Sequence, residues 1–269
     1  YKGNEIPVYV TEDGKYMFLS SPLDMGQNLQ RAQTQTQTST PEIPKSDVPD
    51  VKLFVMSYCP FGIQAEKALI PVLDLLGNKI NYRIHFVYYI MHGKKELDEN
   101  LRQYCIQETQ KEKFKDYLYC FVQSGDYDKC LDEAGIDRNA LKACMETTDQ
   151  QYKIYENYND QSTWYNGRFQ RWDVELELNQ NYGVRGSPTI VINNVRLASS
   201  RRYCSIDDEK SGKCIIYPLD RSPESFKQAI CSAFNNPPEE CNQQLSTQTM
   251  PYGIGPLTGG SATSGGSCG

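Results

Sequence analysis

The sequence predicts an α/β domain with a large helical insertion, preceded by a small N-terminal β-hairpin and followed by a flexible tail. Three observations predict this arrangement. A run of strand-forming apolar residues, VKLFVMS at 51–57, is followed by a segment with helical spacing and by a second strand-like run. Strand signals are absent from about 94 to 183, and they return at 189–194 in TIVINN. Ten cysteines in 269 residues indicate that disulfides cross-link the chain.

The N-terminal segment, 1–26, contains the predicted hairpin. Residues 5–20, EIPVYVTEDGKYMFLS, have the pattern of two short strands around a turn at Glu12–Lys15. A two-stranded ribbon is marginally stable by itself, so we expect it to have a partner in this protein or in another chain. Residues 27–50 are Gln/Thr-rich and then punctuated by proline, which is typical of a linker.

The folded domain is predicted over 51–235. The run 51–57 suits a central buried strand, and apolar residues recur at near-helical spacing over 62–76. A second strand over 80–90 completes a β-α-β unit, whose strands we expect to be parallel. After the insertion, the strand at 189–194, another near 195–199 and a helix over 223–234 capped by Ser222 complete the domain. Residues 236–269 are rich in Pro, Gly, Ser and Thr and predict a flexible coil.

The helical insertion covers about 94–183. Its helical segments are separated by a turn at Ser124–Asp126 and by Asp137, which has the position of a helix N-cap. Four of the ten cysteines fall in this insertion. Short helices at the edge of a core need cross-links more than long ones do, so disulfides are expected here.

Eight cysteines are expected to form structural disulfides, within two ten-residue loops and within the insertion: Cys204 with Cys214, Cys231 with Cys241, and Cys105, Cys120, Cys130 and Cys144 among themselves. Each ten-residue loop would stabilise the fold by about 2.7 kcal/mol on the chain-entropy account. Cys59 and Cys268 are left over.

The cysteine content and the charge limit the compartment and the partners that we expect for this protein. Disulfides favour an oxidising compartment, so an extracytoplasmic location is expected, secreted or at the cell surface. No C-x-x-C pair is present for a metal, and no cofactor motif is found, so neither a metal nor a cofactor is expected. The net charge of −6 argues against a nucleic-acid partner, and no stretch of about 18 apolar residues predicts a membrane span.

Cys59 has the most informative context of the ten cysteines. It lies in Ser-Tyr-Cys-Pro-Phe-Gly at 57–62, between the first core strand and its helix. There Pro60 takes the first helical position, and the helix dipole with its free amides favours a thiolate. The alternative is a structural half-cystine, the ordinary role of a cysteine in such a cysteine-rich chain. The strand-turn-helix position favours the reactive role.

Three segments together, VKLFVMSYCPFGIQAEKAL, the helical insertion and VRGSPTIVINN, resemble the thioredoxin-fold thiol-disulfide oxidoreductases of the DsbA type. They are also similar to lysosomal thiol reductases, and the resemblance covers about 51–234. It implies a thioredoxin-like fold in which Cys59 is the catalytic nucleophile. It also implies that Ser187 and Pro188 form a cis-proline loop that binds the substrate backbone, and we expect Pro60 and Phe61 to line the same site. The partners would be protein thiols or disulfides.

The sequence departs from that family where the second active-site cysteine should stand, because this position is Gly62. A dithiol enzyme resolves its mixed disulfide with that neighbour. Three options remain. Cys59 acts as a monothiol that awaits an external thiol, or it is a catalytically silent relic. In the third option Cys268 resolves the mixed disulfide, since the 27 residues after Cys241 would reach about 29 Å as a flexible coil.

Two functions from different classes follow. The first is an extracytoplasmic thiol-disulfide oxidoreductase or isomerase-like protein that acts through the single active-site cysteine Cys59. The alternative is a redox-inactive, disulfide-stapled subunit of a surface or filament assembly. In that assembly the N-terminal strands would self-associate by completing a neighbour's sheet. Gly62 favours the second function, and the retained Cys59-Pro60 and Ser187-Pro188 pairs favour the first.

Overall fold

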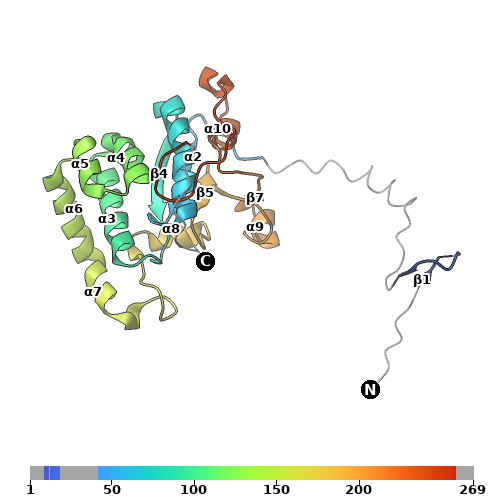
Figure 1. Cartoon of the computed structure of the whole chain (residues 1–269), viewed down its shortest axis with the longest axis horizontal. Helices are drawn as coiled ribbons and strands as arrows, with labels where there is room; N and C mark the ends of the chain where they lie inside the picture. The colour runs from blue at the N-terminus through green and yellow to red at the C-terminus, as the bar shows by residue number, and fades with distance from the viewer. Residues whose placement is uncertain (1–8, 12, 19–41, 259–269) are drawn as a thin grey trace. The chain divides into compact units, whose positions relative to one another are not determined.

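The structure is a computed structural model that describes residues 9–11, 13–18 and 42–258 (Figure 1). The chain divides into two units, 1–42 and 43–269, and each is described by itself. In the first unit, β1 (Tyr9–Val10) pairs with β2 (Met17–Phe18) in antiparallel fashion. The turn between them contains Gly14 at φ 68°, a left-handed conformation that glycine adopts without steric cost. The hairpin prediction is confirmed, and the donation of its strands to another chain stays a prediction.

The second unit is built on a five-stranded mixed sheet of order β4-β3-β5-β6-β7. The strands are β3 (Asp50–Val55), β4 (Asn81–Phe86), β5 (Thr189–Ile192), β6 (Val195–Ala198) and β7 (Cys214–Ile216). The β3–β4 pair is parallel, as predicted, and β5 is antiparallel to both β3 and β6. Strand β7, which pairs parallel with β6, was not predicted, because three residues are too few to show an alternating pattern.

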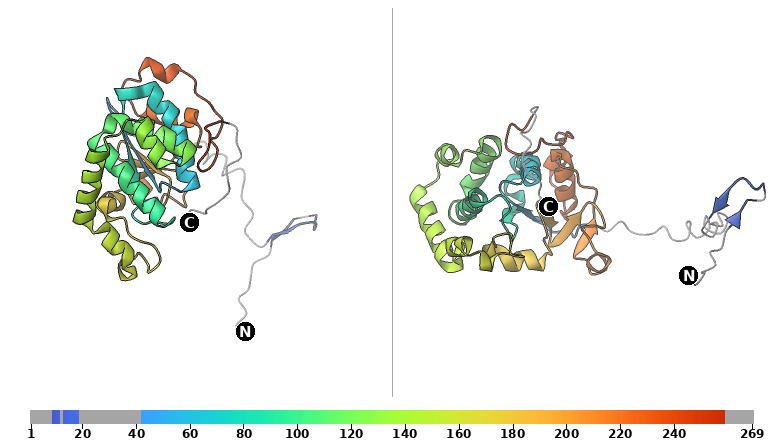
Figure 2. Two further views of the ribbon diagram at one scale, coloured as in Figure 1. Left: turned by 60° about the vertical axis from the view of Figure 1, so that its left-hand side comes forward. Right: turned by 60° about the horizontal axis from the view of Figure 1, so that its bottom comes forward.

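Helices surround this sheet, and most of them belong to the insertion, as predicted. The helices, including short 3₁₀ turns (η), are α2 (Pro60–Leu76), η1 (Gly77–Lys79), α3 (Lys94–Thr109), α4 (Lys111–Ser124), α5 (Tyr127–Glu133), α6 (Arg138–Tyr152), α7 (Ile154–Asn159), η2 (Gln161–Thr163), η3 (Asp173–Glu175), α8 (Leu176–Asn181), α9 (Ile206–Lys210), α10 (Pro223–Ser232) and η4 (Glu239–Asn242). Helices α3 to α7 gather at one side of the sheet, as Figures 1 and 2 show. Helices α2 and α10 pack against each other.

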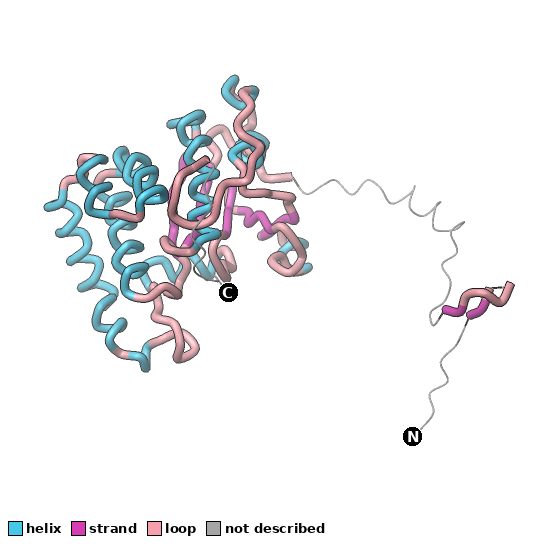
Figure 3. The backbone as a smooth tube through the Cα atoms, in the orientation of Figure 1, coloured by secondary structure: helices cyan, strands magenta, loops and turns pink. Residues whose placement is uncertain are grey.

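Alternate residues of β3 point to opposite faces of the sheet, as the period of a strand requires. Leu53 and Val55 enter the large core cluster with the apolar face of α2 and the insertion helices. Phe54 and Met56 enter a second cluster on the other face. Both faces are therefore covered, which explains the unbroken apolar run from Leu53 to Met56. Figure 3 shows the strands of this sheet in magenta among the cyan helices.

The predicted helix caps are confirmed. The Asp137 carboxylate accepts hydrogen bonds from the amides of Asn139 and Ala140 at the start of α6. The Ser222 hydroxyl accepts one from the amide of Ser225 at the start of α10. These side chains satisfy amides that the helix leaves unpaired, which is why the sequence signals were reliable.

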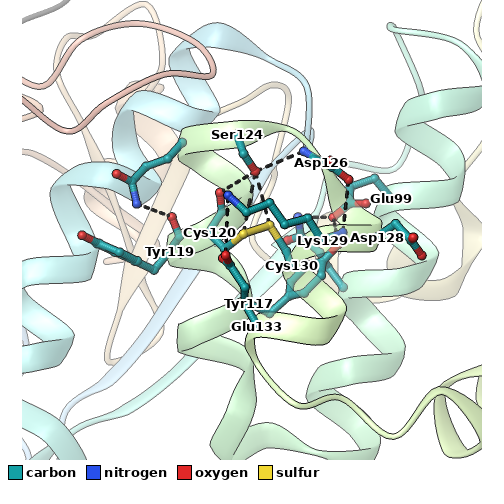
Figure 4. The surroundings of a disulfide bond; sticks show 12 residues. Glu99, Tyr117, Tyr119, Cys120, Ser124, Asp126, Asp128, Lys129, Cys130 and Glu133 are labelled. Carbon is teal, nitrogen blue, oxygen red and sulfur yellow. Dashed lines mark hydrogen bonds and ion pairs between the residues drawn. A yellow bond between two sulfur atoms is a disulfide. The ribbon is translucent and has the colours of Figure 1, made fainter.

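Four disulfides join the eight cysteines that were expected to pair: Cys105–Cys144, Cys120–Cys130, Cys204–Cys214 and Cys231–Cys241. The first joins α3 to α6, and the second joins α4 to α5, with Ser124 Oγ 3.3 Å from Cys130 Sγ (Figure 4). Both ten-residue pairs are confirmed. The structure also selects one pairing among the four insertion cysteines.

The end of the predicted linker belongs to the folded unit. Ile43 is buried in the core cluster, and Ser46 forms a β-bridge with Phe234. The folded unit therefore starts at about residue 43 rather than 51, and residues 27–41 of the linker lie outside the described residues. The proline-rich segment 41–50 has the composition of a linker, because Ile43 is its only large apolar residue before Val48.

The prediction that the chain is a flexible coil from 236 onward is wrong for residues 236–258. The Cys231–Cys241 disulfide fixes the start of this stretch, and η4 follows at Glu239–Asn242. The amide of Gly253 then donates to the carbonyl of Pro60, and that of Gly255 to the carbonyl of Val122. Backbone hydrogen bonds to the domain hold this stretch, and composition does not reveal such bonds. Residues 259–269 lie outside the described residues.

Candidate active site

Cys59 is the N-cap residue of α2, with Pro60 at the first helical position. Its extended backbone, at φ −70° and ψ 122°, lets the chain turn from β3 into the helix. The carbonyl of Cys59 accepts the amide of Ile63, 2.9 Å away. The first turn of α2 contains no acidic residue, so the partial positive charge of the helix N-terminus is not offset there. A thiolate formed at Cys59 would be stabilised at this position.

The loop before β5 faces this cysteine. The Ser187–Pro188 peptide bond is cis, and the carbonyl oxygen of Ser187 lies 3.7 Å from Cys59 Sγ. The Ser187 hydroxyl accepts a hydrogen bond of 3.0 Å from the amide of Met56, which ties the two loops together. The structure thus brings together the residues that the sequence placed in one site.

Gly62 lies where the two loops meet. A Cβ atom at this position would be 2.6 Å from Ser187 Oγ, 3.2 Å from the carbonyl oxygen of Met56 and 3.3 Å from Val55 Cβ. These distances are shorter than ordinary van der Waals contacts. A larger side chain at position 62 therefore requires its neighbours to shift. The glycine is therefore part of the packing of the site as well as a departure from a C-x-x-C motif.

Cys59 is fully buried and is itself disulfide-bonded. The eight cysteines of the four disulfides above are paired with one another. No cysteine is free among those that the structure describes. Cys268, the predicted resolving thiol, lies outside the described residues.

Helix α3 supports the loop that carries Cys59. The amide of Ser57 donates to Asn100 Oδ1 at 3.3 Å, and the Ser57 hydroxyl donates to the carbonyl of Glu96 at 3.4 Å. The Glu96 carboxylate is buried, where it accepts the amide of Met91 and pairs with His92. These bonds fix the loop before α2 to the start of the helical insertion.

A buried carboxyl lies in α2. Burial raises the pKa of Glu66 well above its usual range, and the nearby Glu99 carboxyl raises it further. Neither carboxyl oxygen of Glu66 has a hydrogen-bond partner among the residues that the structure describes. Burial also raises the pKa of Glu99. The Glu99 carboxyl group pairs with Arg102 and accepts a hydrogen bond of 2.7 Å from the Tyr117 hydroxyl. Burial without a cation beside it therefore favours the protonated form of Glu66 over the carboxylate.

Residues 250–258, which we call the C-terminal strap, cover the first turns of α2. Two side chains of the helix hold it: Gln64 donates to the carbonyl of Met250, and Lys67 Nζ donates to that of Gly253 at 2.7 Å. The ring of Tyr252 packs edge-on against Phe61, with ring centroids 5.2 Å apart. Burial lowers the pKa of Lys67 to about 8. The strap thus occupies the side of α2 next to Cys59.

Phe61 also lines a groove of about 540 Å³, which we call the cis-proline groove. Phe61, Ser187 and Pro188 line it together with Tyr203 and four arginines: Arg185, Arg196, Arg202 and Arg221. This size suits a small ligand or a short peptide segment. No local sequence pattern identifies these arginines, because they come from four separate stretches that only the fold brings together.

The described residues contain no group of three or more His, Cys, Asp or Glu side chains placed to hold a metal ion. No described helix is long and apolar enough to span a bilayer.

No protein-family model matches the sequence, and no curated protein matches it. Among solved structures, the chain is similar to the reduced disulfide bond oxidoreductase DsbG from Mycobacterium tuberculosis, with 11% identity, 79% of this chain and 95% of that chain covered, and a TM-score of 0.45. It is similar to reduced DsbA from the same organism, with 12% identity, coverages of 75% and 94%, and a TM-score of 0.44. It is also similar to oxidised BdbD from Bacillus subtilis, with 17% identity, coverages of 65% and 90%, and a TM-score of 0.38.

The fold assignment rests on the features of the chain itself. The parallel β3–β4 pair with α2 between them, the antiparallel β5 and β6, and the cis-Ser187–Pro188 bond beside Cys59 are the features that the sequence resemblance implied. The chain has a thioredoxin-like fold with a disulfide-bonded helical insertion.

Proposed function

We propose that this chain is a thiol-disulfide oxidoreductase in which Cys59 exchanges disulfides with protein substrates and Cys268 acts as the second cysteine. The observation that carries the proposal is the position of Cys59, which caps α2 and lies 3.7 Å from the carbonyl of Ser187 in the cis-proline loop. A helix N-terminus stabilises the Cys59 thiolate, which leaves when the substrate disulfide forms.

The assignment of the second cysteine rests on elimination. Cys59 is disulfide-bonded, and the other eight described cysteines are paired with one another. Of the ten cysteines in the sequence, this leaves Cys268. Gly253 is hydrogen-bonded to Pro60, next to Cys59, and Cys268 follows it by 15 residues. A chain covers up to about 3.5 Å per residue, so the length is ample.

The proposed reaction is a two-step exchange. A substrate thiolate attacks Cys59 Sγ, the Cys59–Cys268 bond breaks, and Cys268 leaves as a thiolate that takes up a proton. A second substrate thiolate then attacks the substrate sulfur of the mixed disulfide, and Cys59 leaves as a thiolate at the N-terminus of α2. The substrate loses two electrons and gains a disulfide, and the protein gains two thiols.

Two consequences follow for the site and its setting. Because Cys59 is buried, the disulfide must become accessible before attack, and the strap over α2 is the segment whose movement would expose it. The other four disulfides favour an oxidising, extracytoplasmic setting. They join cysteines other than Cys59 and serve as structural cross-links.

The test uses the full-length oxidised protein and a peptide with two free thiols, in a single turnover. We expect the wild type to form one peptide disulfide per protein molecule. Cys59→Ser should form none, because it lacks the attacked sulfur. A Cys105→Ala/Cys144→Ala protein is the matched control, since it loses a disulfide between helices α3 and α6 of the insertion and should react at the wild-type rate. Full exchange by Cys59→Ser would overturn the proposal.

A second variant tests the role of Cys268. Cys268→Ser holds Cys59 as a free thiol that can attack a disulfide peptide but cannot resolve the product. We expect a mixed disulfide with Cys59 to accumulate, visible by mass spectrometry without reductant. Stoichiometric oxidation of the dithiol peptide by Cys268→Ser would exclude Cys268 as the second cysteine.

A further inference from the structure

The cis-proline groove is positively charged, although the chain carries a net charge of −6. Among the described residues, four arginines line it and no Asp or Glu side chain does. Arg196 is neutralised where it lies: it pairs with Asp208 at 3.0 Å and donates to the carbonyls of Tyr182 and Gly183. Arg196 thereby holds β6 against the turn at residues 182–183, which precedes β5. The other three arginines determine the charge of the groove.

Arg185, Arg202 and Arg221 form no ion pair with any carboxylate of the described residues. Arg185 and Arg202 are exposed. Arg221 is half-buried, lies 5.2 Å from the centre of the Phe61 ring and donates to Gln64 Oε1 at 3.1 Å. Burial lowers the pKa of Arg221, which reflects the free energy lost when a charge leaves water without a carboxylate partner.

The groove continues directly from the proposed exchange site. Ser187, whose carbonyl lies 3.7 Å from Cys59 Sγ, lines it, and so do Pro188 and Phe61. A substrate whose sulfur reaches Cys59 therefore places its neighbouring residues along the arginines. Guanidinium groups bind carboxylates through paired N–H donors, so they favour acidic side chains over neutral ones at these positions.

We propose that the cis-proline groove selects protein substrates whose reactive cysteine is flanked by Asp or Glu residues, with Arg185, Arg202 and Arg221 as the recognition residues. This proposal rests on the proposed function of Cys59, and it adds the substrate class. The acidic remainder of the protein does not oppose such binding strongly, because charges more than about 8 Å apart in water are largely screened at physiological salt.

The first test measures binding without chemistry. Three fluorescent peptides share one sequence with serine in place of cysteine, and the flanking positions carry four Glu, four Gln or four Lys. Fluorescence anisotropy with the oxidised full-length protein should show the Glu peptide binding about tenfold more tightly than the Gln peptide. The Lys peptide should bind most weakly. The difference should fall several-fold in 0.5 M salt, because exposed charges are screened.

Arginine variants test whether the groove causes the preference for the Glu peptide. Arg185→Gln/Arg202→Gln should bring the affinities for the Glu and Gln peptides to within about twofold of each other. Arg168→Gln is the matched control, because this exposed arginine lies outside the groove, and it should keep the wild-type ratio. Equal affinity of the wild type for all three peptides would overturn the proposal. So would a preference that the double variant retains.

The second test measures exchange, with cysteines restored to the same peptides. A Glu peptide oxidised faster than the Gln peptide, with the ratio lost in Arg185→Gln/Arg202→Gln, supports the substrate class. Equal rates for both peptides overturn the substrate class and leave the proposed function intact. The absence of exchange with any peptide, together with selective binding of the Glu peptide, overturns the proposed function instead.

Discussion

Gly62 packs so closely against Ser187 that a Cβ atom at position 62 would lie 2.6 Å from the Ser187 hydroxyl oxygen. The cis-proline loop therefore fills the space that a side chain at position 62 would need. Glycine at this position lets the first turn of α2 pack against that loop.

The first prediction concerns this contact. Gly62→Ala should lower the free energy of unfolding by about 1–3 kcal/mol, the usual effect of overpacking a buried position. Urea unfolding measures it. Gly186→Ala is the control and should cost little, since no atom lies within 4 Å of the added methyl group. In a Ser187→Ala background, which removes the nearest atom, Gly62→Ala should cost less. An equal cost in both backgrounds would show that Ser187 is not the limiting contact.

Gly62→Cys gives a second prediction, because it restores a C-x-x-C motif. The added side chain meets the same contacts as alanine, so stability should fall by at least as much as in Gly62→Ala. We expect no gain in the single-turnover rate of dithiol oxidation. A stable Gly62→Cys protein that oxidises the peptide faster than the wild type would contradict the view that Gly62 is a packing requirement.

The third prediction concerns the pH dependence of stability. Glu66 has a raised pKa in the folded protein, above the value of 4.5 that it has when exposed. The folded state therefore binds this proton more tightly than the unfolded chain does, and stability falls as the pH rises from 4.5 through the folded pKa. Glu66→Gln removes this titration. Its stability relative to wild type should increase by up to about 1.4 kcal/mol per pH unit in that window.

Thermal or urea unfolding of Glu66→Gln at pH 4 and pH 7 measures this effect. Glu177→Gln, at an exposed position, serves as the control and should show no such trend. A wild-type advantage over Glu66→Gln that grows with pH would mean that Glu66 is ionised and partnered in the folded state.

The fourth prediction concerns the C-terminal strap. Lys67 is buried and donates to the carbonyl of Gly253, so Lys67→Met keeps the apolar bulk and removes this charged hydrogen bond. Such bonds contribute about 1.5–3 kcal/mol. Amide hydrogen exchange at Gly253 and Gly255 should accelerate by about tenfold or more. Lys142→Met, at an exposed site, is the control. Unchanged exchange at both amides would show that Lys67 does not hold the strap.

The sequence predicted the frame of the fold well. Mostly apolar runs at 51–57 and 189–194 identified buried strands, because both faces of the sheet are covered and their central positions are buried on either side. Side-chain caps at Asp137 and Ser222 were visible for a related reason, since each satisfies local backbone amides. Both kinds of signal depend on short stretches of chain.

The missed features depend on contacts between distant segments. Residues 250–258 look like a flexible coil, yet their backbone carbonyls and amides bind Gln64, Lys67 and Pro60, about 190 residues earlier. The arginines of the cis-proline groove are separated in sequence by up to 36 positions, from Arg185 to Arg221. Neither the composition nor the periodicity of a sequence reveals contacts between residues so far apart in the chain. The glycine at 62 was noticed as a missing cysteine, and only the structure shows what it packs against.

Disulfide mapping by mass spectrometry tests the central claim most directly. The native protein is alkylated and digested without reduction, before and after one equivalent of dithiol peptide. We expect a Cys59–Cys268 linked peptide at first, its loss and the alkylation of both cysteines after the peptide is added, and no change in the four other disulfides. Cys59 found free in the native protein, or linked to Cys268 in a bond that the dithiol leaves intact, would contradict the account.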